Sequence, residues 1–234
     1  MPYLQNMTPS DLKSAVEKDL PLFVSAGSIE YHGSQLPLGT DLFICEGILR
    51  EVEKRTDIVI APAFTFSPTG FMVSGPEKGT VDIRLGTFIE YCSEILSAYK
   101  KMGFKHIYVV VHHQGGNIGR FLQIAVEQLN SYSLYEEFGN GWWTNKTPTD
   151  NSCEIKVVPA VFGEEVTKEF FGHGGEGETQ PIMALYPELV HMERLTDNEA
   201  FWNQSAVDAN KADADRALEL LVEQWIKKIE NNQV

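Results

Sequence analysis

Three short segments of the sequence carry carboxylate and imidazole side chains at spacings that suit metal binding. The first is "SAGSIEYHGSQLPLGTD", residues 25–41, in which one residue separates Glu30 from His32. Side chains two positions apart in an extended segment leave the same face, so both are predicted to face one site. Asp41 follows a turn with proline and glycine, and its two oxygens could bridge a pair of ions that activate water. Capping of the next helix is the alternative role for Asp41.

The second segment, "HHQGGN", covers residues 112–117 and follows an apolar, β-branched run. Adjacent strand residues point to opposite faces, so only one of His112 and His113 is expected to reach the site, while the other packs or hydrogen-bonds. The two glycines allow the backbone to approach a ligand closely. Asn117 could orient a ligand or cap the helix that follows.

The third segment, "HGGEGET", covers residues 173–179 and places His173 on a turn framed by glycines. Histidine suits proton transfer there, because imidazole titrates close to neutral pH. Glu178 could ligate a metal, orient His173 or cap the following helix.

The elements that must position these residues alternate between apolar runs and amphipathic stretches. Strands are predicted at 20–26, 57–64, 106–111 and 154–162. Helices are predicted at 8–18 with Ser10 as cap, 42–55, 85–103, 118–129 and 206–230, and a further one after the turns of the third segment. This alternation indicates a parallel sheet with crossover helices. Such sheets bind ligands beyond the carboxyl ends of their strands, where the candidate residues lie.

Two further loops are candidates for contact with a ligand. Residues 66–84 are rich in Gly, Pro and Ser, and the connection is longer than most in a compact domain, so its 67–74 portion is expected to touch substrate. Trp142 and Trp143 lie beside glycines in a stretch without clear periodicity. They could cover the substrate, or pack the loop or an oligomer interface.

Composition narrows the class of protein. The 234 residues are expected to form one domain, residues 1–234, with 33 acidic and 19 basic residues and a net charge of −14. Such a surface repels phosphate backbones, which argues against nucleic-acid binding. No apolar run is long enough to span a bilayer and no export signal is recognised, so a cytoplasmic location is expected.

The cysteines argue against two kinds of stabilisation. Cys45, Cys92 and Cys153 are odd in number and far apart in the sequence. Neither a disulfide framework nor a cysteine-based zinc site is expected, and the three are predicted to be small core residues.

Taken together, the segments resemble the creatininase (creatinine amidohydrolase) family. The family pattern G-S-x-E-x-H-G-x-x-L-P-L-x-T-D is matched at every fixed position by "GSIEYHGSQLPLGTD". "GPEKGTVDI" is similar to the family's "FPGTI" region, "HHQGGN" to "NGHGGN", and "HGGEGET" to "HAGxxET". The resemblance follows the order of the chain over nearly its whole length.

The resemblance implies an α/β fold with three α/β/α layers around a mainly parallel sheet. It also implies two divalent ions, zinc or manganese, that hydrolyse a non-peptide C–N bond. By matching positions, Glu30 would hold one ion, His32 the other, and Asp41 would bridge them. His173 would be the proton shuttle and Glu178 a supporting acid. Family members are homo-oligomers, often hexamers.

One position departs from the family pattern. In a gapless alignment the metal-binding histidine of "NGHGGN" falls on Gln114, and a further carboxylate of creatininase falls on Gly116. Glutamine is a poor zinc ligand. A shift of one residue gives the role to His113, with His112 as the alternative, and leaves Gln114 as a substrate contact. The missing carboxylate argues against creatinine as the substrate.

The prediction from sequence is therefore a metal-dependent amidohydrolase acting on a small cyclic amide or formamide. A deformylase or peptide-trimming hydrolase of a biosynthetic pathway is an alternative within the same class. A non-catalytic family member that binds a small ligand at a degraded metal site is the alternative from another class, and Gln114 is the feature that favours it.

Overall fold

The computed structural model describes residues 3–113, 117–138, 153–170, 172–197, 200–231 and 233–234. Its sheet has four strands: β1 (Leu22–Ala26), β2 (Val59–Phe64), β3 (His106–Val111) and β4 (Glu154–Pro159). The strand order is β2-β1-β3-β4, and every neighbouring pair is parallel. All four strands occupy segments in which the sequence predicts strands.

Helices connect the strands and cover the sheet. The α-helices are α1 (Pro9–Glu17), α2 (Thr40–Glu53), α3 (Leu85–Lys101), α4 (Ile118–Phe138), α5 (Glu164–Glu169), α6 (Glu176–Leu185) and α7 (Lys211–Glu230). Short 3-10 helices are η1 (Leu4–Asn6), η2 (Pro76–Lys78), η4 (Pro187–Leu189), η5 (Met192–Asp197) and η6 (Phe201–Asp208).

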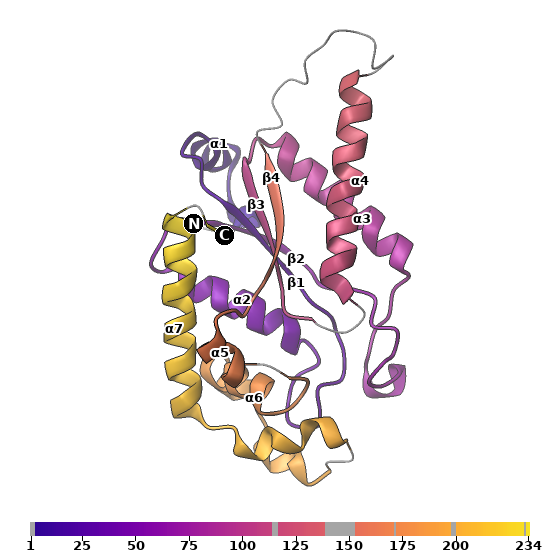
Figure 1. The fold of residues 1–234 in the computed structure, drawn as a ribbon, viewed down its shortest axis with the longest axis vertical. Coiled ribbons are helices and arrows are strands. Elements are labelled where there is room, and N and C mark those ends of the chain that lie inside the picture. Colours follow the sequence, from indigo (N-terminus) through magenta and orange to yellow (C-terminus); the bar gives the residue numbers. More distant parts are fainter. Residues whose placement is uncertain (1–2, 114–116, 139–152, 171, 198–199, 232) are drawn as a thin grey trace.

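The two faces of the sheet bury separate apolar clusters. Phe23 of β1 belongs to a cluster with Ile48 of α2 and Trp225 of α7, whereas the next residue, Val24, belongs to a cluster with Phe88 of α3. This alternation follows from the two-residue period of a strand. In Figure 1, α2, α5, α6 and α7 lie on one side of the sheet and α3 and α4 on the other. The predicted three-layer α/β/α architecture is confirmed.

Three predicted helix boundaries are wrong. Thr8, not Ser10, caps α1, because its hydroxyl accepts the N–H of Asp11. The last helix begins at Lys211 rather than at residue 206, since Asn210 is extended and its side chain accepts from the N–H of Asp213. The helix predicted to end at residue 129 continues to Phe138. Periodicity detects a packed stripe and misses helix ends that lack one.

Two smaller predictions concern cysteines and membrane spans. Cys45 and Cys92 are buried as predicted, while Cys153 is half-buried. Across the described part of the chain, no helix combines the length and apolar character needed to cross a bilayer.

Candidate metal centre

The candidate residues meet at the point where the strand order of the sheet reverses. From β1 the chain passes to β2 on one side, and later to β3 on the other side of β1. Ligands bind in open α/β sheets beyond the carboxyl ends of the strands at such a switch point. The segment after β1 brings Glu30 and His32 there, the segment after β3 brings His112 and His113, and the turn before α6 completes the cluster.

Asp41 lies in the first turn of α2 and does not cap that helix. The N-cap is Gly39, for which no side-chain hydrogen bond is made. Oδ2 of Asp41 instead accepts the hydroxyl of Ser28 at 2.5 Å and the N–H of Ser28 at 3.2 Å. A carboxylate in the first helical turn is also stabilised by the helix dipole. The side chain of Asp41 is therefore held in a fixed orientation toward the cluster.

Gly27 permits the end of β1 to lie close to α2. A Cβ atom added to Gly27 would lie 2.7 Å from Cβ of Asp41. Real Cβ atoms essentially never come so close, so a larger residue would push α2 away from β1. The glycine that opens the first motif is thus explained by packing against Asp41.

The two oxygens of Asp41 face different imidazoles. Oδ1 lies 3.3 Å from Nε2 of His32, and Oδ2 lies 3.0 Å from Nδ1 of His113. Asp41 consequently belongs to two groups whose ligand atoms all lie within 4.8 Å of one another. These groups are Glu30 with Asp41 and His113, and His32 with Asp41 and Glu178.

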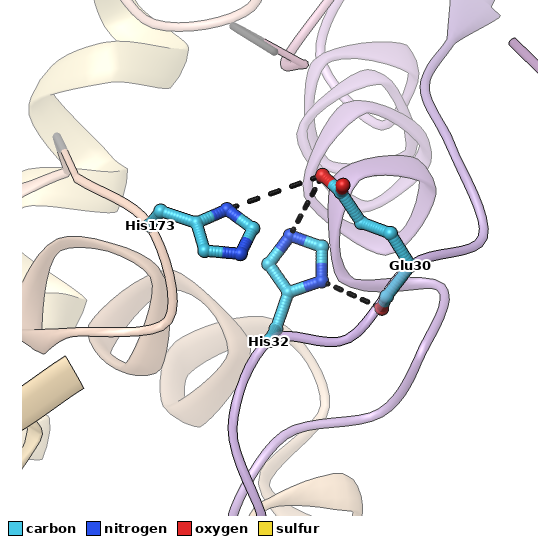
Figure 2. A group of neighbouring side chains, drawn as sticks. All are labelled: Glu30, His32 and His173. Atoms are coloured by element: carbon cyan, nitrogen blue, oxygen red, sulfur yellow. Dashed lines mark hydrogen bonds and ion pairs between the residues drawn. The ribbon is translucent and has the colours of Figure 1, made fainter. Parts of the chain in front are cut away.

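Glu30 and His32 face the same site, as their spacing predicts. Oε1 of Glu30 lies 3.8 Å from Nε2 of His32 and 2.8 Å from Nδ1 of His113. The other ring nitrogen of His32, Nδ1, donates to the backbone oxygen of Glu30 at 3.0 Å, as Figure 2 shows. This bond fixes the ring so that Nε2 faces the carboxylates.

The two histidines after β3 contact different carboxylates. Nε2 of His112 lies 3.4 Å from Oε1 of Glu178, while Nδ1 of His113 lies near Glu30 and Asp41. Among the described residues, only His113 of the two belongs to a group of close ligand atoms and lines the adjoining cavity. The expectation that one imidazole reaches the site while the other packs or hydrogen-bonds is therefore confirmed.

The turn before α6 supplies His173, and the first turn of α6 supplies Glu178. Oε2 of Glu178 accepts the N–H of Gly174 at 2.6 Å and lies 3.6 Å from Nε2 of His32. His173 donates from Nε2 to the backbone oxygen of Tyr31 at 3.0 Å. Its Nδ1 then faces Oε1 of Glu30 at 3.9 Å, visible in Figure 2, and Glu30, His32 and His173 form a third group of close ligand atoms.

Burial and charge shift the titration of this cluster strongly. Burial alone lowers the pKa of His32, but Glu178, Asp41 and Glu30 outweigh it and raise that pKa to about 10. Burial also lowers the pKa of His113, but Asp41 and Glu30 outweigh this effect and raise that pKa to about 10. Burial raises the pKa of Asp41, yet His32 and His113 hold it well below its usual value. The metal-free cluster therefore balances its buried carboxylates with protons on imidazoles.

The residues present fit a divalent ion of the zinc or manganese type. Carboxylates and imidazoles are the ligands that such ions take in catalytic sites. Buried charges need partners, and this cluster holds three buried carboxylates. Nε2 of His113 is also buried without a hydrogen-bond partner among the described residues.

A cavity of about 250 Å³ adjoins the cluster. Its lining residues are Glu30, Asp41, Thr69, Met72, Val73, His113, Gly172, His173 and Glu178. The loop at 66–84 therefore reaches the cavity, and contact of its 67–74 portion with substrate stays a prediction. Asp82 holds the loop, since its Oδ1 accepts the backbone N–H groups of Thr69 and Gly70, both at 2.7 Å.

Sequence reasoning missed two residues of this site and named three others that lie outside the described residues. Ser28 and Trp202, the two that were missed, contact Asp41 and His173, respectively. Ser28 stands at a fixed position of the first motif, which was the available signal, whereas no local pattern marks Trp202. The expected substrate contacts Gln114, Trp142 and Trp143 lie outside the described residues.

The fold resembles solved creatininases. A manganese form of creatininase matches with a TM-score of 0.78 and 16% identity, over 99% of this chain and 98% of that one. A creatininase variant complexed with creatine matches with a TM-score of 0.78, 16% identity and coverage of 99% and 98%. At this level of identity the likeness establishes the fold alone.

Sequence comparison gives two curated relatives and a family. The chain is 22% identical to creatinine amidohydrolase of Pseudomonas putida, over 77% of this chain and 70% of that protein. It is 24% identical to 3-dehydro-scyllo-inosose hydrolase of Thermotoga maritima, over 84% of this chain but only 60% of that protein's length. The model of the creatininase family, described as creatinine amidohydrolase, matches residues 5–229. Because this match spans nearly the whole chain, the protein belongs to the creatininase family of hydrolases.

Proposed function

We propose that the protein is a metal-dependent amidohydrolase that cleaves a non-peptide C–N bond of a small cyclic amide or formamide. The observation that carries this proposal is the position of Asp41 between two groups of metal-ligating atoms. Glu30, Asp41 and His113 would hold one divalent ion, and His32, Asp41 and Glu178 the other. Solved creatininases that resemble this fold include manganese and zinc forms, which supports the choice of metal.

Two bound ions of this kind would lower the pKa of a water molecule and polarise a carbonyl oxygen, so that no side-chain nucleophile is required. The protein's own residues would then manage protons and orientation. Because Nε2 of His173 donates to Tyr31, Nδ1 carries the lone pair in the neutral ring. That atom can accept a proton and return it to the leaving nitrogen.

The cavity restricts the size and approach of the substrate. Its volume of about 250 Å³ suits a small molecule rather than a folded protein chain. Met72 and Val73 of the 66–84 loop contribute apolar surface to its lining. A compact amide with one apolar face fits these walls.

A second candidate function follows from one curated relative. The Thermotoga maritima protein is a hydrolase of 3-dehydro-scyllo-inosose, which is an oxidised cyclitol and not an amide. The same donor set could polarise a ring ketone of that kind. Hydrolysis of polyhydroxylated ring ketones is therefore the alternative function, and such ketones belong among the substrates to be tested.

The proposal also extends to assembly and location. We propose that the protein is a homo-oligomer and that it is located in the cytoplasm. A hexamer is the first expectation, because the family resemblance implies it. Sedimentation velocity on the purified chain would measure the assembly, and a monomer would contradict it.

Elemental analysis and a substrate panel test the function. The purified protein is expected to hold about one or two zinc or manganese ions per chain and to hydrolyse a member of a panel of lactams, formamides and polyhydroxylated ring ketones. Chelation should abolish turnover and re-addition of metal should restore it. Asp41→Ala should lose both activity and most of the metal. An active preparation free of metal would overturn the mechanism.

A matched control separates the role of Asp41 from a general effect of removing charge. Asp57 is exposed and lies just before β2, at the edge of the sheet remote from the cluster. Asp57→Ala should retain both metal and activity. Equal losses in the two variants would show that the assay reports folding instead of metal binding.

A further inference from the structure

The imidazole of His173 packs against two other rings. The ring of His32 lies 4.4 Å away, centroid to centroid, at an interplanar angle of 32°. The ring of Trp202 lies 4.8 Å away on an edge-to-face geometry at 66°. Such pairs prefer defined orientations and stabilise them beyond simple burial. The position of His173 therefore depends on Trp202 as well as on residues of the cluster.

Trp202 also packs against Tyr31, whose backbone oxygen accepts the hydrogen bond from His173. Its ring lies 6.0 Å from that of Tyr31, edge to face at 82°. The backbone oxygen of Tyr31 receives the hydrogen bond from Nε2 of His173 at 3.0 Å. Trp202 thus contacts both partners of the bond that directs Nδ1 of His173 toward Glu30.

The helix η6 that carries Trp202 is packed tightly on the turn before α6. A Cβ atom added to Gly174, which has a φ of +59°, would lie 2.5 Å from Cζ3 of Trp202. The hydroxyl of Ser205, also on η6, accepts the N–H of Glu176 at 3.1 Å. Two independent contacts therefore join η6 to the segment that directly follows His173.

We propose that Trp202 is a positioning residue, which holds the His173 ring in the orientation that leaves Nδ1 facing the metal cluster. This inference rests on the role given to His173 in the proposed function. Loss of the Trp202 ring removes this contact, and the imidazole can then turn away from Tyr31. A misplacement of about 1 Å in such a group costs up to about 100-fold in rate.

Three variants test the proposal by steady-state kinetics. Trp202→Leu removes the ring and keeps an apolar side chain, and it should lower kcat about 10- to 100-fold with KM changed less than about two-fold. Trp202→Phe keeps an aromatic edge and should stay within about three-fold of the native kcat. The control is Phe201→Leu on the same helix, because Phe201 is 83% exposed, and it should leave kcat unchanged.

Metal content and thermal midpoint are measured on every variant, and both should match the native protein. If Trp202→Leu does not fold, Trp202→Met gives the same comparison with a larger apolar side chain. An unchanged kcat in a folded, metal-loaded Trp202→Leu or Trp202→Met protein would overturn the proposal.

A double-mutant cycle separates positioning from a general structural effect. In a His173→Ala background, Trp202→Leu should cause no further loss of kcat, because the group that it positions is gone. Full additivity of the two losses would refute the proposal. If His173→Ala alone leaves kcat unchanged, the role of His173 in the proposed function fails. The NMR measurement described next then tests whether Trp202 positions the ring.

NMR of the zinc-loaded protein with ¹⁵N-labelled histidine reports which nitrogen of His173 carries the proton. The native protein and Trp202→Phe should show the His173 proton on Nε2, and Trp202→Leu should show a mixture of the two tautomers. Identical tautomer signals in all three proteins would mean that Trp202 does not hold the ring.

Discussion

The hydroxyl of Ser28 donates a hydrogen bond of 2.5 Å to Oδ2 of Asp41. This bond fixes one oxygen of the carboxylate that the two groups of candidate ligands share. Partners of this kind typically change metal affinity 10- to 100-fold when they are removed, although they do not touch the ion.

Replacing Ser28 with alanine should therefore weaken zinc binding by about 10- to 100-fold and leave the fold intact. Competition with a chromophoric chelator measures the affinity. Ser25→Ala is the matched control, since Ser25 is also buried but its hydroxyl has no partner among the described residues. Equal affinities for the two variants would show that the Ser28 bond does not support the site.

Replacing Gly27 with alanine should destabilise the protein. The added Cβ would lie 2.7 Å from Cβ of Asp41 and force β1 and α2 apart. Overpacking of this type costs about 1–3 kcal/mol, which corresponds to a fall in thermal midpoint of several degrees for a chain of this length. Gly86→Ala meets nothing within 4 Å and should leave the midpoint unchanged or raise it. A Gly27→Ala protein as stable as Gly86→Ala would refute the packing argument.

Replacing His173 with alanine should lower kcat by about 10²- to 10⁴-fold while the metal content stays at the native level. Plasma emission analysis alongside turnover measures both quantities. His191→Ala is the control, because His191 is half-exposed and pairs with Glu193 at 3.3 Å. Parallel loss of metal would make His173 a ligand within the group that it forms with Glu30 and His32.

Metal binding should release protons and strengthen as pH rises. His32 and His113 each have a pKa of about 10 in the metal-free fold, above the value of 6.5 for an ordinary histidine. Their protons stabilise the metal-free fold fully below about pH 6.5, and that stability is lost as pH rises toward about 10. A divalent ion must displace the same protons, so its affinity should increase across this window.

Calorimetry in buffers of different ionisation enthalpy counts the protons, and about two per chain are expected near pH 7. Thermal unfolding of the metal-free protein should give a lower midpoint at pH 9 than at pH 7. Midpoints that do not change, together with no proton release, would contradict the charge balance inferred for the cluster.

The strands and the segments with candidate metal ligands could be predicted from the sequence for a simple reason. β1 and β3 are short apolar runs, and a run buried on both faces reads as a parallel strand. Parallel strands place their carboxyl ends at one edge, so residues that follow them meet. The convergence of Glu30 and His113 could thus be predicted from local patterns alone.

Contacts that depend on packing between distant segments could not be predicted. Trp202 reaches His173 because η6 folds back onto the turn before α6, and no periodicity or motif encodes that path. Tertiary structure, and not a local pattern, brings these two segments together.

The donor atoms come from chain segments made at very different times during synthesis. Glu30, His32 and Asp41 precede Glu178 by most of the length of the chain. A growing polypeptide can therefore offer an ion only an open, partial set of ligands until α6 has docked.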